Sequence, residues 1–197
     1  MQELAEARDG RTARAARTRN AVVDALLDLV EEGHLRPPAA LVAQRAGVSL
    51  RSVYQHFDDL ETLFRVAAER HQQRLADLEP LPRELPAELE PRVSAFVGHQ
   101  ARWLEAISPM ARAAALQAPF SAGVAARTAA ARARHREKVG AVFAPELRRA
   151  RRSEDLLHAV EMASGWSTWE GLRSAIGLSL DEAVRVVELT LLSLLRP

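Results

Sequence analysis

The segment from residue 50 to residue 56, LRSVYQH, gathers the side chains with the clearest chemistry in this sequence. Arg51, Ser52 and Gln55 are polar, and Tyr54 and His56 are aromatic. Side chains of these kinds reach base edges and phosphates when a helix contacts DNA. A guanidinium can bind O6 and N7 of one guanine together, so Arg51 is the first candidate for reading a base. The segment therefore indicates contact with double-stranded DNA.

Enzyme chemistry finds little support in the same sequence. The segment GWSTW at residues 165–169 approaches a nucleophile elbow, but Trp169 stands where the second glycine belongs, and the segment lies in a predicted helix. The six histidines show no H-E-x-x-H pattern, and neither a Walker loop nor a Gly-rich dinucleotide fingerprint occurs. Cysteine is absent, which excludes disulfides, thiolate metal sites and cysteine nucleophiles. We expect no catalytic residue, no metal and no cofactor.

Two short helices joined by a glycine turn would present the segment 50–56 to DNA. A first apolar-periodic helix ends at Gly47, Val48 points inward, and Ser49 can cap the second helix. This is the helix-turn-helix arrangement, whose second helix lies in the major groove. The residues expected to form the core that holds the motif are Val42, Ala46, Val48, Val53, Phe57 and Leu63.

Helical periodicity predicts helices along the whole chain and no strand, so the expected fold class is all-α with about nine helices. The first helix covers residues 11 to about 32 and ends at Gly33, where a left-handed residue is expected. Pro37 and Pro38 open the second helix. Asp58 and Glu61 form a capping box for a fourth helix, which runs to about Leu78.

The second half of the chain is divided by prolines. The Pro-rich stretch at residues 79–91 is the expected seam between two modules. Breaks are predicted at Pro109, Pro119 and Pro145, because a proline inside a helix loses a hydrogen bond and clashes with the preceding turn. The predicted helices cover about residues 91–107, 109–117, 122–142, 153–176 and 180–195.

The composition of the chain limits the cellular compartment in which the protein is expected. Of 197 residues, 48% are apolar but only 5% aromatic, which favours packed helices. No segment approaches the roughly 18 apolar residues of a membrane span, and the acidic start lacks the apolar region of a secretory signal. These features predict a cytoplasmic protein.

The net charge is only +1, but arginines gather in residues 10–19 and 127–152. Either basic run can be a solvated face. The first adjoins the helix-turn-helix, so phosphate contacts are expected there.

The last two predicted helices carry the pattern of a helix-bundle interface. The small residues Ala163-Ser164-Gly165 allow close helix approach, and leucines repeat along residues 180–195. Pairing with a second copy would form a four-helix bundle, and one helix-turn-helix alone reads too few bases. The alternative is that both helices complete a monomer core. The expected interface residues are Leu156, Val160, Ala163, Ser167, Val187, Leu191 and Leu194.

Aromatic and methionine side chains in the middle helices outline a candidate ligand pocket. As a group they suit a mostly apolar cavity, although each one alone also fits a core position. We expect an apolar or amphipathic ligand of drug or acyl size. The candidates are Phe96, His99, Trp103, Met110, Phe143, His158, Met162, Trp166 and Trp169, with Leu116 and Phe120 as further members.

The stretch AGVS, followed by a short helix ending in VYQHF and then by DDLETLF, resembles the TetR family of bacterial transcription regulators. The close match covers about residues 17–64, and the rest of the chain resembles the family in helix count and layout. The resemblance implies a DNA-binding domain at residues 1–64, with a basic N-terminal arm and a helix-turn-helix at residues 39–57. It implies a helical effector-binding and dimerisation domain at residues 65–197. The expected DNA contacts are Arg17, Arg19, Gln44, Ser49, Leu50, Arg51, Ser52, Tyr54, Gln55 and His56.

The chain departs from the pattern of that family at two places. Leu60 stands where a lysine that touches the DNA backbone is common, and Ala39 and Ala40 occupy a helix entry where a capping Ser or Thr is usual. The arginine-rich N-terminal arm is expected to compensate for the missing lysine.

The predicted function is a DNA-binding transcriptional regulator. It would be a homodimeric repressor that a small-molecule ligand releases from a palindromic operator. The alternative is a helical interaction protein of the same fold, without an inducer, that acts through a protein partner.

Overall fold

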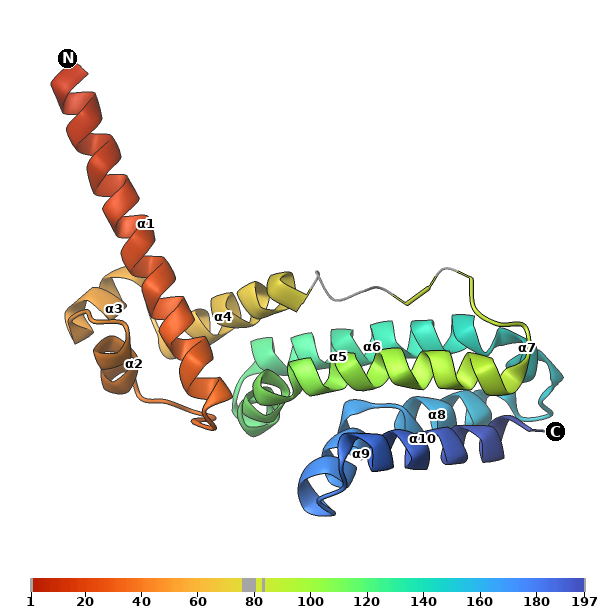
Figure 1. Ribbon diagram of the computed structural model, residues 1–197. Helices are drawn as coiled ribbons and strands as arrows, with labels where there is room; N and C mark the ends of the chain where they lie inside the picture. Colours follow the sequence, from red (N-terminus) through yellow and green to blue (C-terminus); the bar gives the residue numbers. More distant parts are fainter. Residues whose placement is uncertain (1, 76–80, 83, 197) are drawn as a thin grey trace.

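Helices carry nearly all of the chain (Figure 1). The computed structural model describes residues 2–75, 81–82 and 84–196, with side chains from Thr12 onward. It contains ten α-helices and no strand among these residues, which confirms the all-α prediction. The helices are α1 (Gln2–Glu31), α2 (Ala39–Arg45), α3 (Leu50–His56), α4 (Leu60–Leu75), α5 (Leu89–Gln117), α6 (Ala122–Val142), α7 (Ala144–Arg149), α8 (Ser153–Ala163), α9 (Trp166–Glu170) and α10 (Leu180–Leu195), with a 3-10 turn η1 (Ala118–Phe120) and a π-helical turn η2 (Gly171–Ala175).

The first core lies between α1, α2, α3 and α4. The predicted apolar stripe of α1 is buried: Val22 is 0% exposed and Leu26 is 3% exposed. Polar contacts also fix α4 on α1, because Arg70 and Arg74 bind Asp24 at 3.1 Å and 2.5 Å. Fully burying an aliphatic side chain contributes about 1.5–3 kcal/mol, so this apolar face holds the small helices together.

A second core lies between α5, α6, α8, α9 and α10. In Figure 1, α5 and α6 run side by side, with α8 and α10 packed along them. Phe96 of α5 meets Phe143 edge to face, with ring centroids 5.2 Å apart. The two cores are joined because Met110 and Ala113 of α5, and Val124 of α6, belong to the first core. The long helices therefore carry the α1–α4 unit at one end.

The predicted break at Pro109 is wrong, since α5 continues through it from Leu89 to Gln117. An interior proline costs about 3 kcal/mol or more. Leu104 and Met110, on either side of the proline, are 3% and 7% exposed. Burial on both sides of Pro109 offsets that cost, because each such side chain contributes about 1.5–3 kcal/mol.

The predicted helix at residues 153–176 is also interrupted. It ends at Ala163, and the chain turns at Ser164 and Gly165 before α9 begins at Trp166. The backbone at Gly165 is extended, and a Cβ there would lie 3.0 Å from the carbonyl oxygen of Glu161. Instead of continuing one helix, the small residues make a close turn.

Other boundaries differ less. The first helix begins at Gln2, so the basic stretch is part of α1, which projects from the molecule in Figure 1, rather than a separate arm. The cap of α4 is Asp59, whose Oδ1 accepts from the Thr62 amide at 2.6 Å, and not the predicted Asp58. The α4 helix ends at Leu75; its predicted end near Leu78 lies outside the described residues.

Candidate DNA-binding interface and ligand cavity

A glycine turn and a serine cap hold α3 in place. Gly47 adopts a left-handed φ of 66°, and Gly33 does so at 95° after α1, as expected for Gly33. Ser49 Oγ accepts from the Ser52 amide at 3.1 Å, which caps the first turn of α3. Val53 anchors the inner side of α3 at 1% exposure, and Phe57 follows it at 2%. These contacts fix which side of α3 faces outward.

The outward face of α3 carries the residues predicted to contact DNA. Arg51 and Gln55 are exposed, and Leu50 and Tyr54 are 44% and 51% exposed. The Tyr54 ring is therefore not part of the core. Ser52 and His56 are half-buried, while Gln44 and Ser49 are exposed at the end of α2 and the start of α3. Figure 1 shows α2 and α3 side by side at one extremity of the molecule.

The two arginines predicted on α1 differ in their surroundings. Arg17 is exposed. Arg19 is half-buried, and its guanidinium lies 4.9 Å from the centre of the Phe57 ring. This cation–π contact contributes about 0.5–1 kcal/mol at such a site and ties α1 to the end of α3. Arg17 is thus the more accessible of the two for a phosphate.

The start of α4 is acidic. Hydrogen bonds from Thr62 lower the pKa of Asp59, so this carboxylate remains charged at neutral pH. Leu60 beside it is half-buried and packs on the first core. The start of α4, where Leu60 stands in place of a basic side chain, therefore also carries the negative charge of Asp59.

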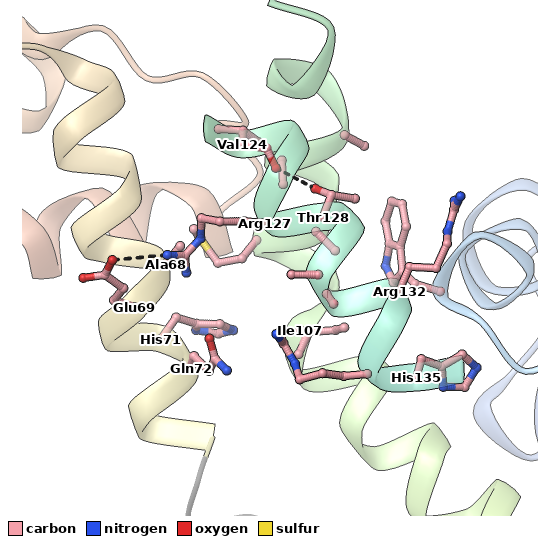
Figure 2. Close-up of a pocket in the computed structure, with 18 of the residues that line it drawn as sticks. Ala68, Glu69, His71, Gln72, Ile107, Val124, Arg127, Thr128, Arg132 and His135 are labelled. Atoms are coloured by element: carbon pink, nitrogen blue, oxygen red, sulfur yellow. Dashed lines mark hydrogen bonds and ion pairs between the residues drawn. The ribbon is translucent and has the colours of Figure 1, made fainter. Parts of the chain in front are cut away.

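A cavity of about 790 Å³ lies between α4, α5, α6 and the α8–α9 turn. Its volume is within the range of about 300–1,000 Å³ that is typical of small-molecule sites. Figure 2 shows part of its polar lining: His71 and Gln72 on α4 lie on the same side of α6 as Arg127, whereas Arg132 and His135 of α6 point away from α4.

The structure places the nine predicted pocket residues in two groups. Trp103, Met110, Met162 and Trp166 line the cavity. Phe96, Phe143 and Trp169 are buried in the second core instead, and His99 and His158 are not among the lining residues. Leu116 and Phe120 are 48% and 80% exposed and lie outside the cavity as well.

The α4 wall of the cavity was not predicted from the sequence. Phe64, Ala68, His71, Gln72 and Leu75 of α4 line it, at spacings of three and four residues along one face. That periodicity was available in the sequence as a second face on the fourth helix. This spacing is hard to recognise, because His71 and Gln72 are polar and a pattern of apolar residues does not include them.

Two histidines of the cavity are held neutral. Burial lowers the pKa of His71, whose Nε2 donates to the Ala106 carbonyl at 3.1 Å. Burial also lowers the pKa of His135. A charged imidazole is disfavoured at both places, because burial removes its solvation.

His135 belongs to a small polar network with Ser164 and Gln100. The Ser164 hydroxyl donates to the Val160 carbonyl at 2.7 Å, so His135 Nε2, 3.0 Å from Ser164 Oγ, is the donor to that oxygen. Gln100 Nε2 then donates to His135 Nδ1 at 3.3 Å and to the Ser164 carbonyl at 3.4 Å. In this arrangement His135 is not a base toward Ser164, whose side chain is buried. The pair is structural rather than nucleophilic.

The predicted interface residues also fall into two groups. Val160, Val187 and Leu191 are 0–5% exposed and pack inside the second core of the same chain, so they are not available to a second copy. Leu156, Ala163 and Leu194 are half-buried against that core, and Ser167 is exposed. The leucine stripe of α10 packs on α5 and α8 of the same chain, which corresponds to the alternative that these helices complete a monomer core.

The outward side of α10 carries other apolar residues. Leu189 and Val186, three residues apart on this helix, are 67% and 38% exposed. Large apolar side chains grouped on one surface mark contact sites for another molecule.

The sequence matches no model of a known protein family and none of the curated proteins. A crystal structure of a transcriptional regulator from Rhodococcus sp. Rha1 is similar to the chain, with a TM-score of 0.66. The two chains are 21% identical, and the similarity covers 92% of this chain and 95% of that one. At this identity the similarity shows the fold: the chain has the all-helical fold of that regulator over almost its full length.

Neither a membrane-spanning helix nor a metal-binding cluster occurs in the described part of the chain. None of the described helices is long and apolar enough to cross a membrane. No group of three or more His, Cys, Asp or Glu side chains that could hold a metal ion occurs in the same part of the chain.

Proposed function

We propose that this protein is a transcriptional regulator of the TetR type that binds palindromic DNA as a homodimer and represses until a small molecule occupies its cavity. The observation that carries the proposal is the outward face of α3. It presents Arg51, Tyr54 and Gln55 to solvent, while Val53 fixes the helix from the inside. Side chains of these types on an exposed helix fit the major groove.

The two proposed domains correspond to the two cores. We propose that residues 1–64 form the DNA-binding domain and that residues 65–197 form the effector-binding and dimerisation domain. Contacts of α4 and of the α5–α6 ends with the first core would carry a change in the cavity to α3.

Dimerisation is proposed through the outward side of α10 and the helix α8 packed beside it. The exposed apolar residues Val186 and Leu189 support this surface. Two heads related by a two-fold axis would read two half-sites, which a single α3 of seven residues cannot do.

Selection of duplexes from random DNA tests the proposal. We expect a palindrome with half-sites about 10 bp apart or a multiple of it. Failure to enrich any sequence would contradict the regulator and favour a protein of the same fold that acts through a protein partner.

The base contact of Arg51 is tested on the selected site. Arg51→Ala is expected to cost about 1–3 kcal/mol of binding free energy and to relax the preference at one base pair. Arg148→Ala, an exposed arginine on α7, is the matched control and should leave binding unchanged. Equal weakening on all sequences would instead assign Arg51 to a phosphate.

A further inference from the structure

A histidine of α4 places a hydrogen-bond acceptor in the wall of the cavity. His71 is 8% exposed and lines the cavity, and its ring projects away from α4 in Figure 2. Its Nε2 lies 3.1 Å from the Ala106 carbonyl oxygen of α5. Because a carbonyl oxygen can only accept, Nε2 carries the hydrogen of the ring.

The other ring nitrogen is therefore the acceptor. Burial lowers the pKa of His71, so the ring is neutral at about pH 7.5 and Nδ1 keeps its lone pair. Nδ1 has no hydrogen-bond partner among the described residues, and, unlike Gln100 Oε1, it is not fully covered by protein. A ligand in the cavity can therefore donate a hydrogen bond to this atom.

The wall around His71 is apolar. Ala68 and Leu75 lie three and four residues from His71 on the same face of α4, and both line the cavity. Trp103 and Ile107 of α5 line it from the neighbouring helix. An apolar body of a ligand would displace water from these surfaces.

Other polar side chains of the lining already use their hydrogen bonds within the chain. Thr128 Oγ1 donates to the Val124 carbonyl at 3.0 Å. His135 differs from His71 in that both of its ring nitrogens have partners, Gln100 at 3.3 Å and Ser164 at 3.0 Å. Of the two histidines in the lining, only the one on α4 therefore has an acceptor left for a ligand.

The charged side chains of the lining balance one another. Glu69 pairs with Arg65 at 2.9 Å and with Arg127 at 3.2 Å, a contact that is dashed in Figure 2. With no net charge, the wall favours neither an anion nor a cation. The described lining residues include four acids and four arginines: Asp59, Glu61, Glu69, Glu161, Arg65, Arg127, Arg132 and Arg134.

We propose that the cavity binds a neutral, mostly apolar molecule with a hydroxyl or N–H group, and that this group donates to Nδ1 of His71. The apolar body of the molecule contacts Trp103 and Ile107 and the apolar side chains of α4. This inference rests on the proposed function, in which the cavity holds the effector.

Three naphthalenes of similar size test the class of ligand: 2-naphthol, 2-methoxynaphthalene and 2-naphthoate. The first can donate a hydrogen bond, the second can only accept one, and the third is an anion. Binding to the full-length protein without DNA is measured by equilibrium dialysis at about pH 7.5, where His71 is neutral. We expect 2-naphthol to bind at least about fivefold more tightly than the other two compounds. Equal binding of 2-naphthol and 2-methoxynaphthalene, tighter binding of 2-naphthoate, or no binding of 2-naphthol would overturn the proposal.

The acceptor is tested by His71→Leu, which removes Nδ1 but keeps an apolar side chain of similar size. We expect 2-naphthol to lose its advantage over 2-methoxynaphthalene, while 2-methoxynaphthalene binds as before and so shows an intact cavity. The matched control is Gln72→Leu, at the neighbouring polar residue of the cavity lining, which should keep the preference for 2-naphthol. A preference that survives in His71→Leu, or that is lost equally in Gln72→Leu, would overturn the role of His71.

The unaltered protein offers a second measurement, which does not depend on how His71→Leu folds. In nitrogen NMR, the Nδ1 resonance of His71 should move when 2-naphthol binds and much less when 2-methoxynaphthalene binds, because only 2-naphthol donates to the lone pair. Equal shifts with both compounds would contradict the hydrogen bond. Because DNA is absent from these measurements, their failure is distinguishable from a failure to select an operator.

Discussion

Gly47 makes the turn between α2 and α3, and its left-handed φ of 66° is a conformation that other residues rarely adopt. No atom would lie within 4 Å of a Cβ added there, so the cost of substitution is conformational and not steric. Gly47→Ala is therefore expected to lower the free energy of unfolding by about 1–2 kcal/mol. Urea denaturation measures this change.

The matched control is Gly98→Ala, inside α5, where a Cβ is also free of contacts. There alanine is expected to raise the free energy of unfolding by about 0.5–1 kcal/mol, because glycine is a poor helix former. Equal effects of the two substitutions would contradict the argument from φ.

The burial of His71 and His135 beside the cavity makes the stability of the protein depend on pH. Burial lowers the pKa of both below the usual value of 6.5, so the unfolded chain takes up protons first as the pH falls. Their contribution to stability is complete above that value and is lost as the pH falls below it. We expect the free energy of unfolding to decrease between about pH 7.5 and about pH 5.5.

Variants assign that decrease to the two histidines. His71→Gln and His135→Gln should each reduce the dependence of unfolding on pH, measured by urea denaturation at both values. His34→Gln, at an exposed position, serves as the control and should keep the full dependence. A dependence that is the same in all three variants would show that other groups cause it.

At the scale of elements, local signals in the sequence predicted several helices well. The segments 50–56, 122–142 and 180–195 match α3, α6 and α10, since each begins after a serine that caps it. Pro109 and Gly165 were misjudged because their effect depends on distant partners. Burial along α5 tolerates the proline, and the α8–α9 turn needs the small residues.

The cavity shows the same limit. Trp103, Met110, Met162 and Trp166 were named from residue type alone, whereas Gln100 and His135 were not. Their importance comes from contacts between α5, α6 and α8, which lie far apart in the sequence. Nor does residue type distinguish Phe96 and Phe143, which are core, from Trp103, which lines the cavity.

The N-terminal turns of α1 allow a prediction about an element. Arg14 is exposed, and the corner at Leu60 lacks a basic side chain. Deleting residues 1–16 is expected to lower DNA affinity and to flatten its dependence on salt, because fewer phosphates are neutralised. Binding to the selected palindrome at several salt concentrations measures the slope. An unchanged slope would show that this basic stretch does not contact phosphates.

At the scale of the whole molecule, the proposed function depends on how two copies meet. Leu189 is 67% exposed at the centre of the outward face of α10, whereas Val187 and Leu191 beside it are buried in the chain's own core. A stripe of leucines on a helix therefore does not by itself say which side faces a partner. Burial in the monomer decides it, and here it leaves Leu189 free for the proposed interface.

Leu189→Glu would place a carboxylate in an apolar interface, and burying it without a partner costs several kcal/mol. We expect the dimer to dissociate at least about tenfold more readily in sedimentation equilibrium, with little change in thermal unfolding of the monomer. Leu116→Glu, at an exposed leucine of α5, is the control and should remain dimeric. DNA affinity should fall with the dimer, since two half-sites are then no longer bound together. A Leu189→Glu variant that stays dimeric would place the interface on another surface and leave the exposed α10 face without a role in assembly.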